Sequence, residues 1–166
     1  MKIITFFLLA SFLCFSQENP KYERFKIENQ NIIWQNIYQK DSIYNSENFK
    51  EKLKLNFTSN TTGFANNQKL KCKGLAIYMN SNFGFNFLIE EKDNKYKITV
   101  YDIYFEDNFQ LNIGSVSTSQ KNTLLSDMEL RTSDNTFRKN SQSNKNMLCL
   151  DNYLLNLFHL KTDTSW

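Results

Sequence analysis

Hydrophobic and polar residues alternate most regularly between Phe83 and Phe105. In the first part of this segment the apolar side chains fall at every second position, at Phe83, Phe85, Phe87 and Ile89. Asp93-Asn94 interrupts the pattern, which resumes at Tyr96, Ile98 and Val100. A period of two is typical of a strand with one buried face, and a short polar pair suits a tight turn. The segment therefore predicts a β-hairpin.

Two other segments have strand character. Residues 22–39 contain two apolar runs on either side of the polar turn Glu28–Asn31, as in a pair of short strands. The second run, Ile32–Gln39, has apolar groups on both faces, which predicts a strand that is covered on both sides or shows aromatic rings to a partner. Lys69–Met79 alternates lysines with apolar residues at its start, so we predict a strand with a bulge at Gly74.

Helical spacing predicts the remaining elements. Apolar residues recur every four positions at Phe49, Leu53 and Phe57, so we expect a helix over Asn45–Phe57. A short helix is expected over Thr123–Leu130 and an amphipathic helix over Leu148–Leu160.

Residues 106–146 are polar and rich in Ser, Thr, Asn and Gln. We expect a short strand around Phe109–Ile113 and a flexible loop over Ser133–Asn146. The order of all these elements predicts an α+β domain, with an antiparallel meander sheet and helices on one face.

The first sixteen residues have the pattern of a secretory signal peptide. Lys2 precedes the apolar run Ile3–Phe15, and Ser16 is followed by polar residues from Gln17 onward. The run is shorter than the roughly 20 residues that span a bilayer. We therefore predict a signal peptide over 1–16 and one exported domain over 17–166, periplasmic or secreted. The alternative is a lipoprotein with Cys14 as its lipidated residue, although Leu13 fits that processing site poorly.

The formal net charge is +3 for the whole chain and +2 without Lys2. This small value argues for no particular polyanionic partner. A row of lysines can form a basic strip on one sheet face: Lys69, Lys71, Lys73, Lys95 and Lys97. Phosphates attract such a strip, but export separates the protein from the chromosome. We expect a solvated face, with lysines that guard against edge pairing, and no nucleic acid partner.

Two cysteines, Cys72 and Cys149, remain after removal of the signal. An exported protein can keep a disulfide between them, and two buried free thiols are the alternative. Spacing alone does not decide between the two states.

Few residues suggest catalysis. His159 is the single histidine and falls on the polar face of the expected terminal helix, so we interpret it as a solvated residue. Asp102, Glu106 and Asp107 cluster at a strand end, where carboxylates can hold a cation or act as acid and base. A polar run that ends the strand explains them as well. No cofactor or metal is expected.

Four aromatic residues are candidates for ligand binding, because an open sheet face lined with aromatic rings can hold a sugar, a peptide or a protein. They are Trp34, Tyr38, Tyr78 and Tyr101. Packing in the core is the alternative role for each of them.

Several segments together resemble a known family. They are Ile32–Gln39, the expected helix Asn45–Phe57, Lys71-Cys72-Lys73-Gly74, the hairpin ending in Tyr101-Asp102-Ile103, and the signal ending in Phe15-Ser16-Gln17. They resemble small exported proteins of Bacteroidota, a domain family of unknown function with a TATA-binding-protein-like fold. The likeness covers Glu23–Asp107 and the terminal helix. It implies a curved antiparallel sheet with two helices on its convex face, and it carries over no catalytic residues.

The sequence therefore predicts an exported, non-enzymatic α+β domain that binds a protein or a component of the cell envelope. One alternative is a hydrolase that uses the carboxylates at the strand end, with or without a metal. Another is an envelope protein with a purely structural role.

Overall fold

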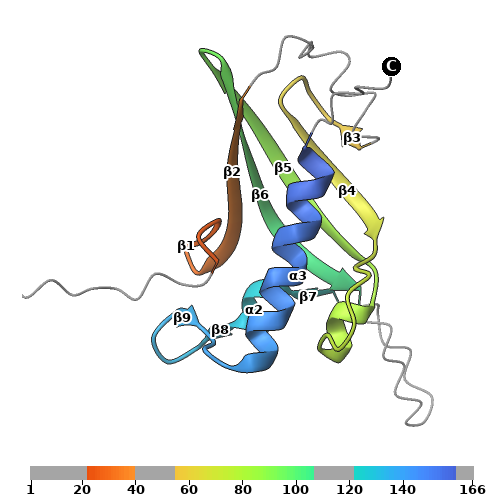
Figure 1. The fold of residues 1–166 in the computed structure, drawn as a ribbon, viewed down its shortest axis with the longest axis vertical. Helices are drawn as coiled ribbons and strands as arrows, with labels where there is room; N and C mark the ends of the chain where they lie inside the picture. The colour runs from red at the N-terminus through yellow and green to blue at the C-terminus, as the bar shows by residue number, and fades with distance from the viewer. Residues whose placement is uncertain (1–21, 40–54, 107–121, 160–166) are drawn as a thin grey trace, which may run out of the picture.

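The computed structural model describes residues 22–39, 55–106 and 122–159. A seven-stranded antiparallel sheet has the order β1-β2-β6-β5-β4-β3, with β7 paired to β6. Its strands are β1 Phe25–Glu28, β2 Asn31–Gln39, β3 Asn56–Phe57, β4 Thr62–Gln68, β5 Phe83–Lys92, β6 Lys95–Glu106 and β7 Asn122–Leu124. Helix α3, Ser141–Phe158, crosses the front of the sheet (Figure 1). The expected α+β class is confirmed.

Shorter elements gather at the lower end of the sheet (Figure 1). They are the 3-10 helix η1 Ile77–Asn80, the helix α2 Leu125–Glu129, and the two-stranded ribbon of β8 Leu130–Arg131 and β9 Thr136–Phe137. Helix α2 matches the short helix expected from the sequence. The backbone amide of Ile32 donates to Ser126 Oγ at 2.9 Å, which holds α2 against β2.

Both expected hairpins are confirmed. In the turn between β1 and β2, Asn29 and Gln30 have φ angles of 49° and 65°. Asp93 has φ 52° in the turn between β5 and β6. Asn and Asp adopt this left-handed backbone region more readily than most residues, which explains why polar pairs at these sites reverse the chain. Strands β3 to β6 follow one another as a meander, and the first hairpin joins beside β6.

The core lies between α3 and the facing side of the sheet. The ring of Phe158, in the last turn of α3, packs against Trp34, Phe85 and Phe87 at centroid distances of 6.1, 6.2 and 5.7 Å. All four side chains are fully or almost fully buried. Close aromatic packing of this kind adds to the free energy of burial, so α3 fixes the face of the sheet that is covered.

A bulge changes which residues of β6 face the core. Tyr96, Ile98 and Val100 are buried, but the next buried residues are Ile103 and Phe105. The pairing with β5 shifts between Gly84 and Asn86, and Asp102 has φ 50°. One extra residue in a strand moves the following side chains to the other face. The bulge therefore keeps apolar residues inward at both ends of a long strand.

The prediction of a strand over Lys69–Met79 is wrong. The observed strand β4 lies earlier, at Thr62–Gln68, where no strand was predicted. Residues 69–76 form a loop that leads into η1. The lysine alternation imitates a strand, whereas Gly63 in β4 weakens its strand signal although its backbone pairs with Phe87. A Cβ at Gly63 would collide with the ring of Phe87 and the carbonyl of Asn56.

Two further expectations are corrected. The flexible loop predicted over Ser133–Asn146 instead contains β9 and the first turns of α3. Helix α3 begins seven residues before the expected start at Leu148, because the Asn140 side chain caps it by accepting from the Ser143 amide at 2.7 Å. Phe57, expected in a helix, lies in β3.

Other expectations fall on residues outside the described segments. These are the signal peptide, most of the helix predicted over Asn45–Phe57, and the strand around Phe109–Ile113.

Candidate functional site

A hollow of about 510 Å³ opens where η1, the end of β6 and the start of α3 meet. Its rim carries two exposed apolar side chains, Ile77 at 70% and Met128 at 38%. Polar groups of Arg138 and Gln142 line another part of the wall. A concave site that combines apolar surface with a few polar groups is the usual form of a ligand site, so we take this hollow as the candidate site.

Glu129 lies in the wall of the hollow and is only 2% exposed. Three donors converge on its carboxylate. Tyr78 Oη donates to Oε1, Ser143 Oγ donates to Oε2, and Asn146 Nδ2 donates to Oε1 at 2.8 Å. Charge-assisted hydrogen bonds offset the desolvation of a buried carboxylate. The network therefore joins α2, η1 and α3 into one wall.

Burial and the nearby Glu129 charge raise the pKa of the Tyr78 hydroxyl. Both effects disfavour a phenolate, so Tyr78 stays a hydrogen-bond donor to Glu129 at neutral pH. Ser143 is 3% exposed, and its hydroxyl donates a hydrogen bond to the same carboxylate. These groups are arranged to hold one another in place.

The loop over residues 69–76 is fastened to α3 at three points. Cys72 and Cys149 form a disulfide that closes a sequence separation of 77. Gln142 Nε2 donates to the Gly74 carbonyl at 3.0 Å, and the Ala76 amide donates to Asn146 Oδ1 at 3.1 Å. The loop leads directly into Ile77 and Tyr78. These three links therefore position one side of the hollow.

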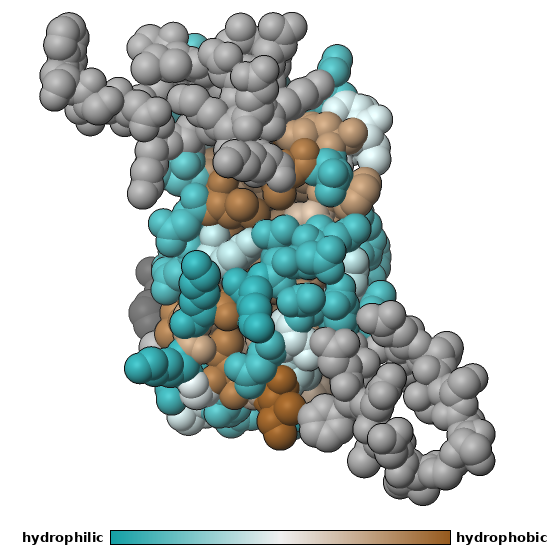
Figure 2. All heavy atoms as spheres, turned by 90° about the vertical axis from the view of Figure 1, so that its right-hand side faces the viewer, coloured by the Kyte–Doolittle hydropathy of each residue, from teal (hydrophilic) through white to brown (hydrophobic). Residues whose placement is uncertain are grey.

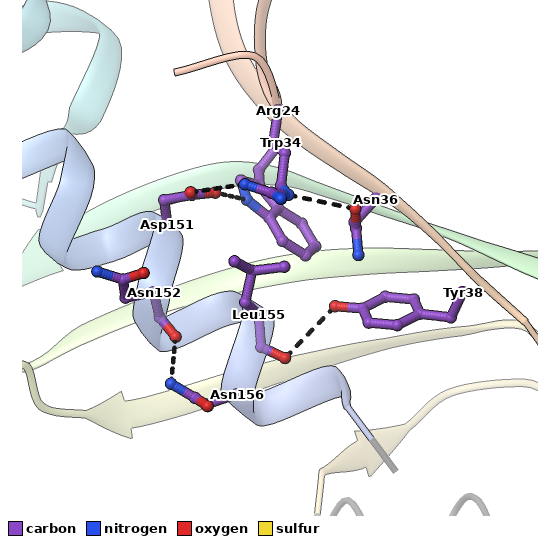
Figure 3. Close-up of polar contacts among 8 residues, drawn as sticks. All are labelled: Arg24, Trp34, Asn36, Tyr38, Asp151, Asn152, Leu155 and Asn156. Atoms are coloured by element: carbon purple, nitrogen blue, oxygen red, sulfur yellow. Dashed lines mark hydrogen bonds and ion pairs between the residues drawn. The ribbon is translucent and has the colours of Figure 1, made fainter. Parts of the chain in front are cut away.

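Of the four aromatic candidates, Trp34 and Tyr38 lie on the covered face of the sheet (Figure 3). Trp34 is fully buried, and its Nε1 donates to Asp151 Oδ1 at 2.8 Å. Tyr38 is 9% exposed and stacks on Tyr96 at a centroid distance of 5.0 Å. Neither ring is part of an open face. Both pack in the core, which is the alternative role expected for them.

Asp151 connects α3 to the strand β2. Besides Trp34, it binds Arg24 Nη1 at 3.0 Å through Oδ2, and Arg24 Nε in turn donates to Asn36 Oδ1 at 3.2 Å (Figure 3). Burial raises the pKa of Tyr38 to about 12. Its hydroxyl lies 3.5 Å from the Leu155 carbonyl. This cluster anchors the helix to the sheet.

Tyr78 and Tyr101 lie apart from these two. Tyr78 lines the hollow, as described above. Tyr101 is half-buried, and the pairing places it in a cross-strand row with Asn86 and Phe64. This row lies on the sheet face opposite α3. The four candidates therefore do not form one surface, and the hollow brings Tyr78 together with residues that the sequence did not single out.

The carboxylates at the strand end also separate. Glu106 lines the hollow, whereas Asp102 is exposed and accepts from Asn86 Nδ2 at 3.1 Å without lining it. Asp107 lies outside the described residues. In segments 22–39, 55–106 and 122–159, no group of three or more His, Cys, Asp or Glu residues is placed to hold a metal ion. His159 is exposed and lies directly after α3, at its C-cap.

The lysine row divides in the same way. Lys97 forms an ion pair with Glu90 on the sheet, and Lys95 lies beside the β5–β6 turn. Lys69, Lys71 and Lys73 lie in the loop next to α3. A single basic strip over one sheet face is therefore not formed.

The signals of the hollow in the sequence were weak. Glu129 and Ser143 look like ordinary surface residues of a polar region, and only their contacts across 14 positions reveal the shared bond. Ile77 falls inside the strand predicted over Lys69–Met79, and no pattern in the sequence marks it as exposed.

Among the residues that the structure describes, no helix is long and apolar enough to cross a membrane.

No protein-family model matches the chain, and no curated protein matches it. Among solved structures, a TBP-like protein from Parabacteroides distasonis is similar, with 12% sequence identity and a TM-score of 0.47. The match covers 80% of this chain and 94% of that protein.

Proposed function

We propose that this protein is an exported, non-enzymatic domain that binds a protein or a cell-envelope component through the hollow beside η1. The observation that carries the proposal is the rim of the hollow, where Ile77 is 70% exposed at the edge of a rigid polar wall. A large aliphatic side chain so exposed gains free energy when a partner covers it. The hydrogen-bonded wall needs little rearrangement to receive that partner.

The polar groups of the wall favour binding over hydrolysis. The carboxylate of Glu129 already accepts three hydrogen bonds, one of them from the Ser143 hydroxyl. A nucleophilic serine needs a free base and access to the substrate. Ser143 is 3% exposed, and its acceptor Glu129 is also bound by Tyr78 and Asn146. The hydrolase alternative would use Asp102, Glu106 or Asp107 converging in a cleft. Of these, Glu106 lines the hollow, Asp102 does not, and Asp107 lies outside the described residues.

Export is part of the proposal and rests on the pattern of residues 1–16. Mass spectrometry of the protein recovered from its native host tests it. A chain that starts at Gln17 supports export with cleavage, and a chain that starts at a lipidated Cys14 supports the lipoprotein alternative. An intact Met1 on intracellular protein would contradict export.

Site-specific photo-cross-linking tests the binding site. A photoreactive phenylalanine analogue replaces Ile77 in one variant and Ile37 in the control, because Ile37 is 62% exposed on β2, away from the hollow. We expect one discrete adduct with envelope material from the Ile77 position and none from Ile37. As an unlabelled competitor, the Ile77→Glu variant should also reduce the yield of that adduct less than unlabelled wild type does. Equal labelling from both positions, or none from Ile77, would favour the purely structural role.

A further inference from the structure

A group of lysines gathers where the loop over residues 69–76 meets α3. Lys71 and Lys73 flank Cys72, and the disulfide fixes Cys72 to Cys149 of the helix. Lys145 precedes Cys149 by about one helical turn, and its Nζ lies 3.4 Å from the place where a Cβ on Gly74 would be. Together with Lys69, these residues are called the basic patch: Lys69, Lys71, Lys73 and Lys145.

The positive charge of the basic patch has little local compensation. Residues 69–82 contain no Asp or Glu, and neither does α3 from Ser141 to Leu150. The next carboxylate on the helix, Asp151, is buried and bound to Trp34 and Arg24. No lysine of the patch forms an ion pair with another residue in the described segments, whereas Lys97 pairs with Glu90.

An exposed apolar side chain accompanies these lysines. Leu148, 38% exposed, follows Lys145 by three residues and therefore shares its side of the helix. Figure 2 shows apolar and hydrophilic side chains side by side in the lower half of the face that carries the end of β4 and η1. Lysines beside exposed aliphatic groups are typical of surfaces that lie on a membrane.

We propose that the basic patch docks the domain onto a membrane surface that carries anionic phospholipid headgroups. This goes beyond the proposed function, because the patch lies on the loop and the outer side of α3 and acts independently of a ligand in the hollow. The lysines attract the headgroup phosphates, while Leu148 contacts the boundary of the acyl region. A soluble polyanion would satisfy the lysines and leave that aliphatic group in water.

The expected affinity is modest and depends on salt. Each lysine near an anionic surface raises membrane partitioning roughly fivefold, so loss of three lysines lowers it about 100-fold. The attraction acts over about one Debye length and weakens as salt is added. The disulfide matters here because it holds the loop lysines next to Lys145.

Vesicle flotation tests the proposal on the full exported chain, purified from the periplasm of an expression host. The probes are vesicles of phosphatidylcholine alone and of phosphatidylcholine with about 30% phosphatidylglycerol, at about 50 mM and about 500 mM salt. We expect flotation only with the anionic vesicles at low salt. The patch variant is Lys71→Gln/Lys73→Gln/Lys145→Gln. Its matched control is Lys26→Gln/Lys92→Gln/Lys95→Gln, which removes the same charge from exposed lysines of β1 and the β5–β6 hairpin.

Each outcome decides the proposal. Loss of flotation by the patch variant, with the control unchanged, supports it. Equal loss of flotation in both variants would contradict the proposal, because net charge alone would then explain binding. Equal flotation with both kinds of vesicle would also contradict it and would point to an N-terminal lipid. Binding to soluble polyphosphate without flotation would also overturn it in favour of a polyanion. Circular dichroism of both variants excludes unfolding as a cause. The cross-link at Ile77 is scored separately, so failure of one proposal leaves the other open to its own test.

Discussion

Trp34 Nε1 donates a 2.8 Å hydrogen bond to Asp151 Oδ1, which joins the centre of the sheet to the middle of α3 across 117 residues of sequence. Trp34 is fully buried and Asp151 is 6% exposed. The second oxygen of Asp151 binds Arg24. One carboxylate therefore fixes the position of the helix over the sheet.

Replacement of Asp151 by Ala is expected to destabilise the fold by about 2–4 kcal/mol, because it leaves a buried indole N–H and a half-buried guanidinium without their acceptor. Urea denaturation, followed by tryptophan fluorescence, measures the change. Asn152→Ala, at the exposed neighbouring position, is the control and should stay within about 0.5 kcal/mol of wild type. A similar loss in both variants would refute the anchoring role.

The disulfide between Cys72 and Cys149 is expected to stabilise the domain by roughly 4 kcal/mol, as the chain-entropy relation gives for a closed loop of this length. Cys72→Ser/Cys149→Ser should therefore unfold at a much lower urea concentration. Reduction of wild type with dithiothreitol should produce the same midpoint. If the reduced protein and the double variant both keep the wild-type midpoint, the disulfide adds no stability.

Glu129→Gln is expected to lower the free energy of unfolding by about 1–3 kcal/mol. The amide group brings its own donors to a site where Tyr78, Ser143 and Asn146 already donate. Asp127→Asn on the same helix is the matched control. Asp127 is exposed, and its substitution removes the same charge as Glu129→Gln. Denaturation of both variants separates the buried network from net charge. Equal stability of the two variants would show that the network is not required.

Alkaline pH should weaken the domain through Tyr38. Its pKa is raised by burial to about 12 in the folded state, from an ordinary value near 10. Folding therefore favours the neutral hydroxyl. The resulting stabilisation is fully present below about pH 10 and is lost as pH rises through about 12.

Tyr38→Phe should flatten this alkaline fall in the free energy of unfolding between about pH 10 and 12. Stability measured by urea denaturation at several pH values tests the slope. Tyr101→Phe is the control, because Tyr101 lies on the face opposite α3. If wild type and Tyr38→Phe show the same slope, ionisation of Tyr38 does not govern alkaline stability.

Local pattern was sufficient where burial on one face and turn chemistry agree. The alternation from Phe83 onward and the Asp93-Asn94 turn predicted the β5–β6 hairpin. It was not sufficient for β4, whose glycine and small polar residues carry no strand pattern. There the backbone of β5 selects the conformation, since Gly63 lets the ring of Phe87 approach.

The sequence by itself determined the two hairpins, the α+β class and the amphipathic character of the terminal helix, because each depends on the spacing of neighbouring residues. Tertiary structure alone decided the hollow, the Glu129 network and the basic patch. These join residues that are far apart along the chain, such as Lys73 and Lys145. It also chose between the two roles open to Trp34. Apolar residues lie on both faces of Ile32–Gln39. Only the packing of α3 shows that Trp34 lies on the face that the helix covers.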